Sequence, residues 1–235
     1  MAPICFGVLV YHWQAIDVIG PLDLLNSCTK DALSYVHHHG GSTQETVDQA
    51  PEFEFHSIGE TLDPVPVYTK PISIIPSVTV EDCPDLDCLI IGGPLPEGFQ
   101  FPPKYIDFIK KHHAAGKTIF TTCTGASALA TTGVLDGKNA TVNHVEFNWV
   151  AKEYPLVKWT RKTKWVVDRN IWTSGGAVSG MDMFAHWIKT NFGFEVMLGG
   201  AIGLDFEPRD QDGLFTIVPK RFDADGKQVS SHVFP

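Results

Sequence analysis

Residues 118–135 read TIFTTCTGASALATTGVL, an apolar strand pattern that runs directly into Cys123 and then into a segment of small residues. Gly125, Ala126 and Ser127 allow a following helix to pack closely against the strand. This succession predicts a strand, a sharp turn and a helix, with the Cys123 side chain raised above the carboxyl edge of a sheet. The segment therefore predicts an α/β fold with a nucleophile elbow.

The predicted turn favours thiol chemistry at Cys123. A thiol at the beginning of a helix lies near the positive end of the helix dipole, which lowers its pKa and increases the thiolate fraction. Backbone N–H groups of the same turn, including that of Thr124, can stabilise an oxyanion. We expect Cys123 to act as a nucleophile, and a buried cysteine at a strand end is the alternative interpretation.

Short apolar segments alternate with amphipathic segments along the chain. The predicted strands cover residues 4–11, 53–58, 89–91, 118–122, 165–167 and 171–173, and the predicted helices cover 104–115, 126–135, 145–153 and 181–191. This alternation favours a mostly parallel sheet with helices on both faces. The segment 157–175 departs from it, and its Asp-Arg-Asn sequence indicates the turn of a β-hairpin.

Composition and charge narrow the class of protein. The 235 residues are 43% hydrophobic and 19% charged, which is typical of a globular chain with a single core. A net charge of −9 argues against nucleic-acid binding, and no apolar run reaches the ~18 residues of a membrane span. Five irregularly spaced cysteines argue against a disulfide framework. We expect one cytoplasmic domain over residues 1–235, with a surface insertion at 28–50.

A second glycine-rich segment, LIIGGPLPEG over residues 89–98, follows a predicted strand. Gly92 and Gly93 allow the backbone to approach a ligand closely, and in an open α/β sheet this loop reaches the same edge as Cys123. We expect these glycines to contribute the second oxyanion donor. An ordinary tight turn before Pro94 is the alternative.

The segment QAIDVIGPLDLLN, residues 14–26, places Asp17 among apolar side chains. Burial of a carboxylate raises its pKa, and a carboxyl that holds its proton can act as a general acid beside a thiol. Asp17 is therefore a candidate acid or base. A loop aspartate that caps the following helix is the alternative.

His144 lies at the beginning of a predicted helix downstream of Cys123. A cysteine with a downstream histidine is typical of thiol catalysis, so His144 is a candidate for tuning the thiol, and a structural histidine is the alternative. Glu146 either orients that imidazole or lies in the first turn of the helix. The run 37–39 is expected to be a solvated surface, and without a metal-ligand spacing we expect no metal.

These motifs together resemble the ThiJ/PfpI superfamily, relatives of the class I glutamine amidotransferases. The resemblance rests on FGVLVYHWQAIDVIGPLDLL, LIIGGP, TCTGASALATTGVLDGKNATVNH and VVDRNIWTSGGAVSGMDMFAHWI, in that order along most of the chain. It implies a flavodoxin-like three-layer sandwich with a mostly parallel sheet. The branch that looks nearest contains the isonitrile hydratases, whose acidic and Cys-Thr-Gly positions match Asp17, Cys123 and Thr124.

The resemblance also implies a function. Cys123 would attack a small electrophilic carbon, Asp17 would manage the proton, and backbone N–H groups near Gly93 and Thr124 would hold negative charge. An enzyme of this kind needs no cofactor, acts on a small-molecule substrate and commonly forms a homodimer. Asp182, in TSGGAVSGMDM, is expected to fix a helix. Glyoxalase or deglycase chemistry on 2-oxoaldehydes, and a non-catalytic role of Cys123 as redox sensor or chaperone, are the alternatives.

Overall fold

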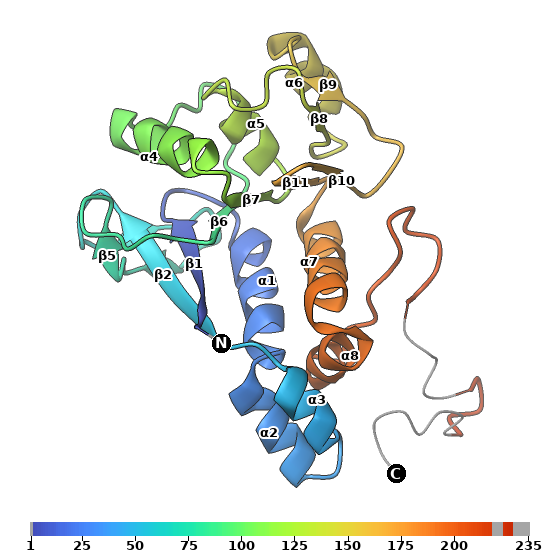
Figure 1. Ribbon diagram of the computed structural model, residues 1–235. Coiled ribbons are helices and arrows are strands. Elements are labelled where there is room, and N and C mark those ends of the chain that lie inside the picture. Colours follow the sequence, from blue (N-terminus) through green and yellow to red (C-terminus); the bar gives the residue numbers. More distant parts are fainter. Residues whose placement is uncertain (1, 218–222, 228–235) are drawn as a thin grey trace. The chain divides into compact units, whose positions relative to one another are not determined.

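The computed structural model describes residues 2–217 and 223–227, and over these residues seven strands form one sheet (Figure 1). Its strand order is β10-β11-β7-β6-β1-β2-β5. The strands are β1 (Ile4–Leu9), β2 (Phe53–Gly59), β5 (Val78–Thr79), β6 (Cys88–Ile91), β7 (Thr118–Thr121), β10 (Trp165–Asp168) and β11 (Ile171–Ser174). β1, β6, β7 and β11 pair in parallel, and β10 runs antiparallel to β11. The predicted α/β, flavodoxin-like fold class and the β-hairpin are confirmed.

Helices follow most of the strands. They are α1 (Ala15–Ser27), α2 (Lys30–His38), α3 (Gln44–Gln49), α4 (Pro103–Ala114), α5 (Gly125–Ala130), α6 (Phe147–Glu153), α7 (Ala177–Phe192) and α8 (Phe194–Gly203). Short strands form two further pairs, β3 (Val65–Pro66) with β4 (Ser73–Ile74) and β8 (Asn139–Ala140) with β9 (Lys158–Trp159). In the part of the chain that the structure describes, no helix is long and apolar enough to cross a membrane.

The centre of the sheet carries the core. All four residues of β6 are buried, and α4 packs on β7 while α5 packs on both β6 and β7. Strands of a parallel sheet are covered on both faces, which explains why β6 reads as an unbroken apolar run. Phe6 and Phe120, which have no exposed surface, stack with ring centroids 6.5 Å apart. This packing fixes the strand ends from which the catalytic candidates project.

The chain groups into two compact units, each assembled from separate segments. Residues 4–20 and 54–180 form the unit that contains the sheet, and residues 21–53 group with the segment that begins at 181. Within the second group, residues 28–50 fold into α2 and α3, which pack against each other and against α8. The single domain expected over 1–235 stays a prediction.

Helix α8 was not predicted from the sequence, because glycine weakens a helix pattern. Gly199 and Gly200 have a packing reason in the structure: a Cβ at Gly199 would lie 2.7 Å from Leu33 of α2, and one at Gly200 would strike the Cys28 sulfur. The glycines therefore let α8 approach α2 and the end of α1. Cys28, the first residue of the segment expected to be a surface insertion, is buried at this contact.

Candidate active site

Cys123 occupies the predicted elbow between β7 and α5. Its φ angle is 56°, in the left-handed region that costs energy for any residue with a Cβ. The Gly125 N–H closes the turn on the Thr122 carbonyl at 2.8 Å, and a Cβ at Gly125 would collide with the Ile91 carbonyl. The glycine thus permits the close approach of α5 to the end of β6. Strain of this kind is typical of a functional residue held by its surroundings.

Asp17 lies in the first turn of α1, with no exposed surface. Its Oδ2 accepts a hydrogen bond from the Gly93 N–H at 3.0 Å, and its carbonyl accepts one from Thr122 Oγ1 at 2.9 Å. Burial raises the pKa of Asp17 to about 7, against the opposing hydrogen bonds from Gly93 and the Cys123 thiol. Asp17 Oδ1 has no partner of hydrogen-bonding geometry among the described residues, although the thiol is near enough to act on the carboxyl.

The loop that follows β6 holds the acid and the elbow together. A Cβ at Gly93 would lie 2.5 Å from Thr124 Oγ1 and 2.6 Å from Asp17 Oδ2, so only glycine fits. Thr124 Oγ1 donates to the Pro94 carbonyl at 2.6 Å, which fastens the elbow to this loop. Because the Gly93 N–H is bound to Asp17, it is not free to hold an oxyanion in the unliganded site. The oxyanion roles of Gly92, Gly93 and Thr124 stay predictions.

Asn143 is the side chain that the sequence interpretation missed. Its Nδ2 donates a hydrogen bond to the Cys123 sulfur at 3.1 Å. The amide orientation is set because its Oδ1 accepts from the Val145 N–H at 2.9 Å, while the Asn143 N–H donates to the Cys123 carbonyl at 3.3 Å. An asparagine has no titratable group and attracts no attention in a search for acids and bases. Its position directly before His144 was the available signal.

Burial raises the pKa of the Cys123 thiol to about 11, and the negative charges of Asp17 and Glu146 add to the rise. The hydrogen bonds from the Asn143 side chain and the Thr124 backbone oppose it. The expected lowering of the thiol pKa is therefore wrong for the unliganded site. The sulfur is shielded from water and faces a carboxyl, and these effects outweigh the donors at the turn.

A pocket of about 170 Å³ opens beside the sulfur. It is lined by Gln14, Tyr68, Gly93, Pro94, Leu95, Pro96, Cys123, Thr124, Asn143, Val145 and Glu146. His144 is exposed and is not among the residues that line this pocket, whereas its neighbours Asn143 and Val145 are. The tuning role of His144 stays a prediction. Glu146 is the N-cap residue of α6, directly before the first turn in which it was expected, and it lines the pocket.

Potential metal ligands lie away from the pocket. Within residues 2–217 and 223–227, one group brings three such atoms within 4.8 Å of one another, and it consists of Cys5, Glu54 and His56. Cys5 is near the amino end of β1, whereas Cys123 follows the carboxyl end of β7, so the group lies at the other edge of the sheet. The ring nitrogens of His37 and His39 contact the carbonyls of Ser42 and Tyr35.

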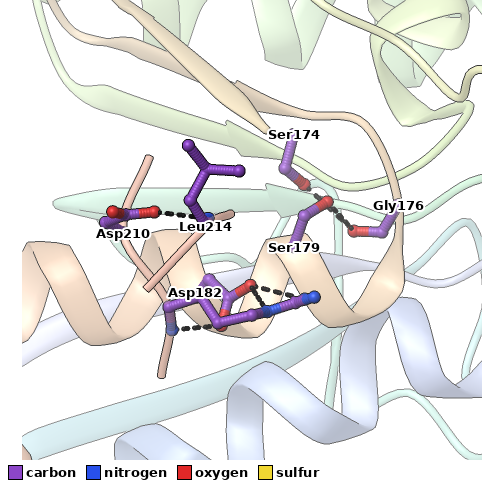
Figure 2. Close-up of polar contacts among 7 residues, drawn as sticks. Ser174, Gly176, Ser179, Asp182, Asp210 and Leu214 are labelled. Atoms are coloured by element: carbon purple, nitrogen blue, oxygen red, sulfur yellow. Dashed lines mark hydrogen bonds and ion pairs between the residues drawn. The ribbon is translucent and has the colours of Figure 1, made fainter. Parts of the chain in front are cut away.

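Asp182 of α7 has the structural role that its sequence context indicates (Figure 2). Its Oδ1 accepts from the Arg209 N–H at 2.9 Å, and its Oδ2 accepts from Arg209 Nη2 and Nε at 2.8 and 3.1 Å. The side chain has no exposed surface, so the guanidinium compensates a fully buried carboxylate. The pair fastens the segment after α8 to α7.

The mostly parallel sheet and the strained cysteine after β7 define an α/β protein with a nucleophile elbow. Residues 5–190 match the DJ-1/PfpI family. The chain belongs to this family. The recognition of the ThiJ/PfpI superfamily from the sequence is confirmed.

The chain is similar to two curated proteins and to a solved structure. Isonitrile hydratase from Pseudomonas putida is 29% identical over 174 residues, a match that covers 72% of this chain and 63% of that protein. The HTH-type transcriptional regulator GbdR from Pseudomonas aeruginosa is 28% identical over 125 residues, which cover 53% of this chain and 34% of the regulator. The crystal structure of a ThiJ/PfpI family protein from Pseudomonas syringae superposes with a TM-score of 0.68 at 20% identity, covering 89% of this chain and 78% of that one. The chain thus spans less than two thirds of either curated relative.

Proposed function

We propose that the protein is a cofactor-free, cysteine-dependent hydratase that adds water to a small electrophilic carbon, with an isonitrile as the model substrate. The observation that carries the proposal is that Cys123 and Asn143 line one small pocket, with the buried Asp17 carboxyl next to the thiol. Similarity to isonitrile hydratase from Pseudomonas putida supports the choice of substrate class.

In the first step the Cys123 sulfur attacks the terminal carbon of the isonitrile. The thiol proton passes to the Asp17 carboxylate as the sulfur–carbon bond forms, and the carbon takes a proton back from Asp17. The product is a thioimidate bound to Cys123. The Asn143 amide donates to the sulfur and stabilises the negative charge that develops there.

In the second step Asp17 accepts a proton from water, and the oxygen adds to the thioimidate carbon. Collapse of the tetrahedral adduct forms the carbonyl and expels the Cys123 thiolate. One proton of the water goes to nitrogen and the other returns to the Cys123–Asp17 pair. The released product is an N-substituted formamide, so atoms and charges balance without a cofactor.

Two observations weigh against the alternatives. Glyoxalase chemistry with a histidine partner is disfavoured because His144 is exposed and does not line the pocket. A redox sensor requires a thiol with a low pKa, whereas burial raises that of Cys123. Buried Asp17, which holds a proton more strongly than an ordinary aspartate, fits proton transfer to carbon.

The test is turnover of an alkyl isonitrile and of methylglyoxal by wild type and Cys123→Ser. We expect release of the N-alkylformamide by wild type, a loss of at least about a thousandfold in the variant, and no consumption of methylglyoxal. Consumption of methylglyoxal without turnover of the isonitrile would identify a glyoxalase and contradict the proposed hydratase. Isonitrile turnover that survives in Cys123→Ser would remove Cys123 from the chemistry.

A further inference from the structure

Glu146 has a feature that the proposed reaction does not use. It lies directly before α6, where its carbonyl accepts the Val150 N–H at 2.9 Å. Its Oε2 is buried and has no hydrogen-bond partner among the described residues. A buried carboxylate oxygen without a donor costs free energy, so a group that supplies a donor or a positive charge is favoured at this point.

Glu146 also connects two neighbouring pockets. It lines the pocket beside Cys123 and a second one of about 420 Å³, together with Leu95 and Pro96. The second pocket adds Glu97 and Trp149, whose side chain is partly exposed. A molecule whose reactive carbon lies at the sulfur can therefore extend past Glu146 toward the indole.

The charges of this region have one sign. Glu97 and Glu146 are carboxylates, Asp17 lies behind the sulfur, and neither pocket has a lysine or arginine among its described lining residues. Carboxylates attract a cation at short range, and the face of a tryptophan ring attracts one as well. The same arrangement repels an anion.

We propose that the two pockets form a binding site for compounds that carry a positively charged nitrogen, which Glu146 recognises beside the reactive carbon. Such a compound places its ammonium group between the Glu146 carboxylate and Trp149. The substrate class that follows is a small aminoalkyl electrophile. This inference refines the proposed function, but it can be tested through the thiol alone.

The test uses alkyl methanethiosulfonates, which differ in charge but react by one chemistry. The Cys123 sulfur attacks the sulfenyl sulfur, a disulfide forms, methanesulfinate leaves, and the thiol proton passes to Asp17 or water. We would measure modification of the Cys123 peptide by mass spectrometry with 2-aminoethyl, ethyl and 2-sulfonatoethyl reagents. Cys123→Ser gives the background from the other cysteines.

In Glu146→Gln the rate with the cationic reagent should fall about tenfold relative to the rate with the neutral reagent. Glu153→Gln removes a carboxylate from the exposed end of the same helix, outside both pockets, and should leave the ratio unchanged. An unchanged rate with the neutral reagent shows that Glu146→Gln is folded. Glu146→Asp is a second variant that keeps the charge, and it should retain most of the rate with the cationic reagent.

Equal cationic-to-neutral ratios in wild type and folded Glu146→Gln would overturn the inference, as would an equal fall in Glu153→Gln. If wild type turns over no isonitrile but its preference for the cationic reagent still depends on Glu146, the proposed hydration is excluded and the cation-binding site is supported. The two failures are therefore distinguishable.

Discussion

Cys123, Asp17 and Asn143 come from three separate segments of the chain, and each is fixed by backbone hydrogen bonds of a neighbour. Asn143 is the clearest case, since the Val145 N–H binds its Oδ1 while its Nδ2 donates to the sulfur. Burial raises the pKa of both the thiol and the carboxyl. The Asp17 charge raises the thiol pKa further and the Cys123 thiol lowers the carboxyl pKa, so the two groups titrate together. The reactive form of this pair carries one proton.

Removal of the Asn143 amide should destabilise the thiolate form of Cys123. A hydrogen bond to a charged group contributes roughly 1.5 kcal/mol or more, so Asn143→Ala should slow iodoacetamide alkylation of Cys123 at pH 8 about tenfold. Asn26→Ala removes an exposed amide that bonds only within α1 among the described contacts, and it should react like wild type. Equal alkylation rates in all three proteins would exclude a role for Asn143 at the sulfur.

The pH dependence of hydration follows from Asp17. Below its pKa of about 7 the carboxyl already holds a proton and cannot accept the one on the thiol; above it the carboxylate can. The value of kcat/KM should therefore rise with pH through about 7. In Asp17→Asn both this rise and most of the activity should disappear, and a variant with the wild-type pH profile would assign the inflection to another group.

The turn at the end of β6 requires glycine at position 93, because the elbow after β7 packs closely against it. Gly93→Ala should lower the free energy of unfolding by about 1–3 kcal/mol and abolish hydration, because the methyl group displaces Asp17 and Thr124. Gly203→Ala, where nothing lies within 4 Å of the added Cβ, should change neither. Urea unfolding measures both variants. A Gly93→Ala protein of full stability and activity would show that the elbow tolerates displacement.

An ion pair between Arg209 and the buried Asp182 holds the segment after α8 to α7. Arg209→Ala leaves the Asp182 carboxylate buried without compensation and should cost about 2–4 kcal/mol in stability by the same measurement. Lys104→Ala breaks an exposed pair with Glu81 and should cost less than about 1 kcal/mol. Equal effects would mean that the Asp182 pair is no stronger than a surface contact.

Elements with a strong local pattern were predictable, and those that depend on packing were not. β6 and β7 read as apolar runs, and the elbow follows from the Cys-Thr-Gly sequence. The helix predicted over 126–135 stops at Ala130, because residues 131–137 continue as turns with Gly133 and Gly137 at positive φ. Asp17 was found because an acid in an apolar segment is conspicuous, whereas Asn143 acts through a hydrogen bond that no local pattern records.

At the scale of the whole molecule we propose a homodimer, the assembly that the family resemblance implies. Light scattering coupled to size exclusion should give twice the chain mass of 25.9 kDa, independent of loading concentration over the micromolar range. A mass equal to one chain at all concentrations would contradict the dimer.

The most direct test of the account is a search for the covalent intermediate on Cys123. Wild type mixed with an alkyl isonitrile and quenched in acid within the first turnover should show the Cys123 peptide with the added mass of one isonitrile. The adduct should be absent from Cys123→Ser. Formamide production in the first turnover with no modified Cys123 peptide would contradict nucleophilic catalysis by this thiol.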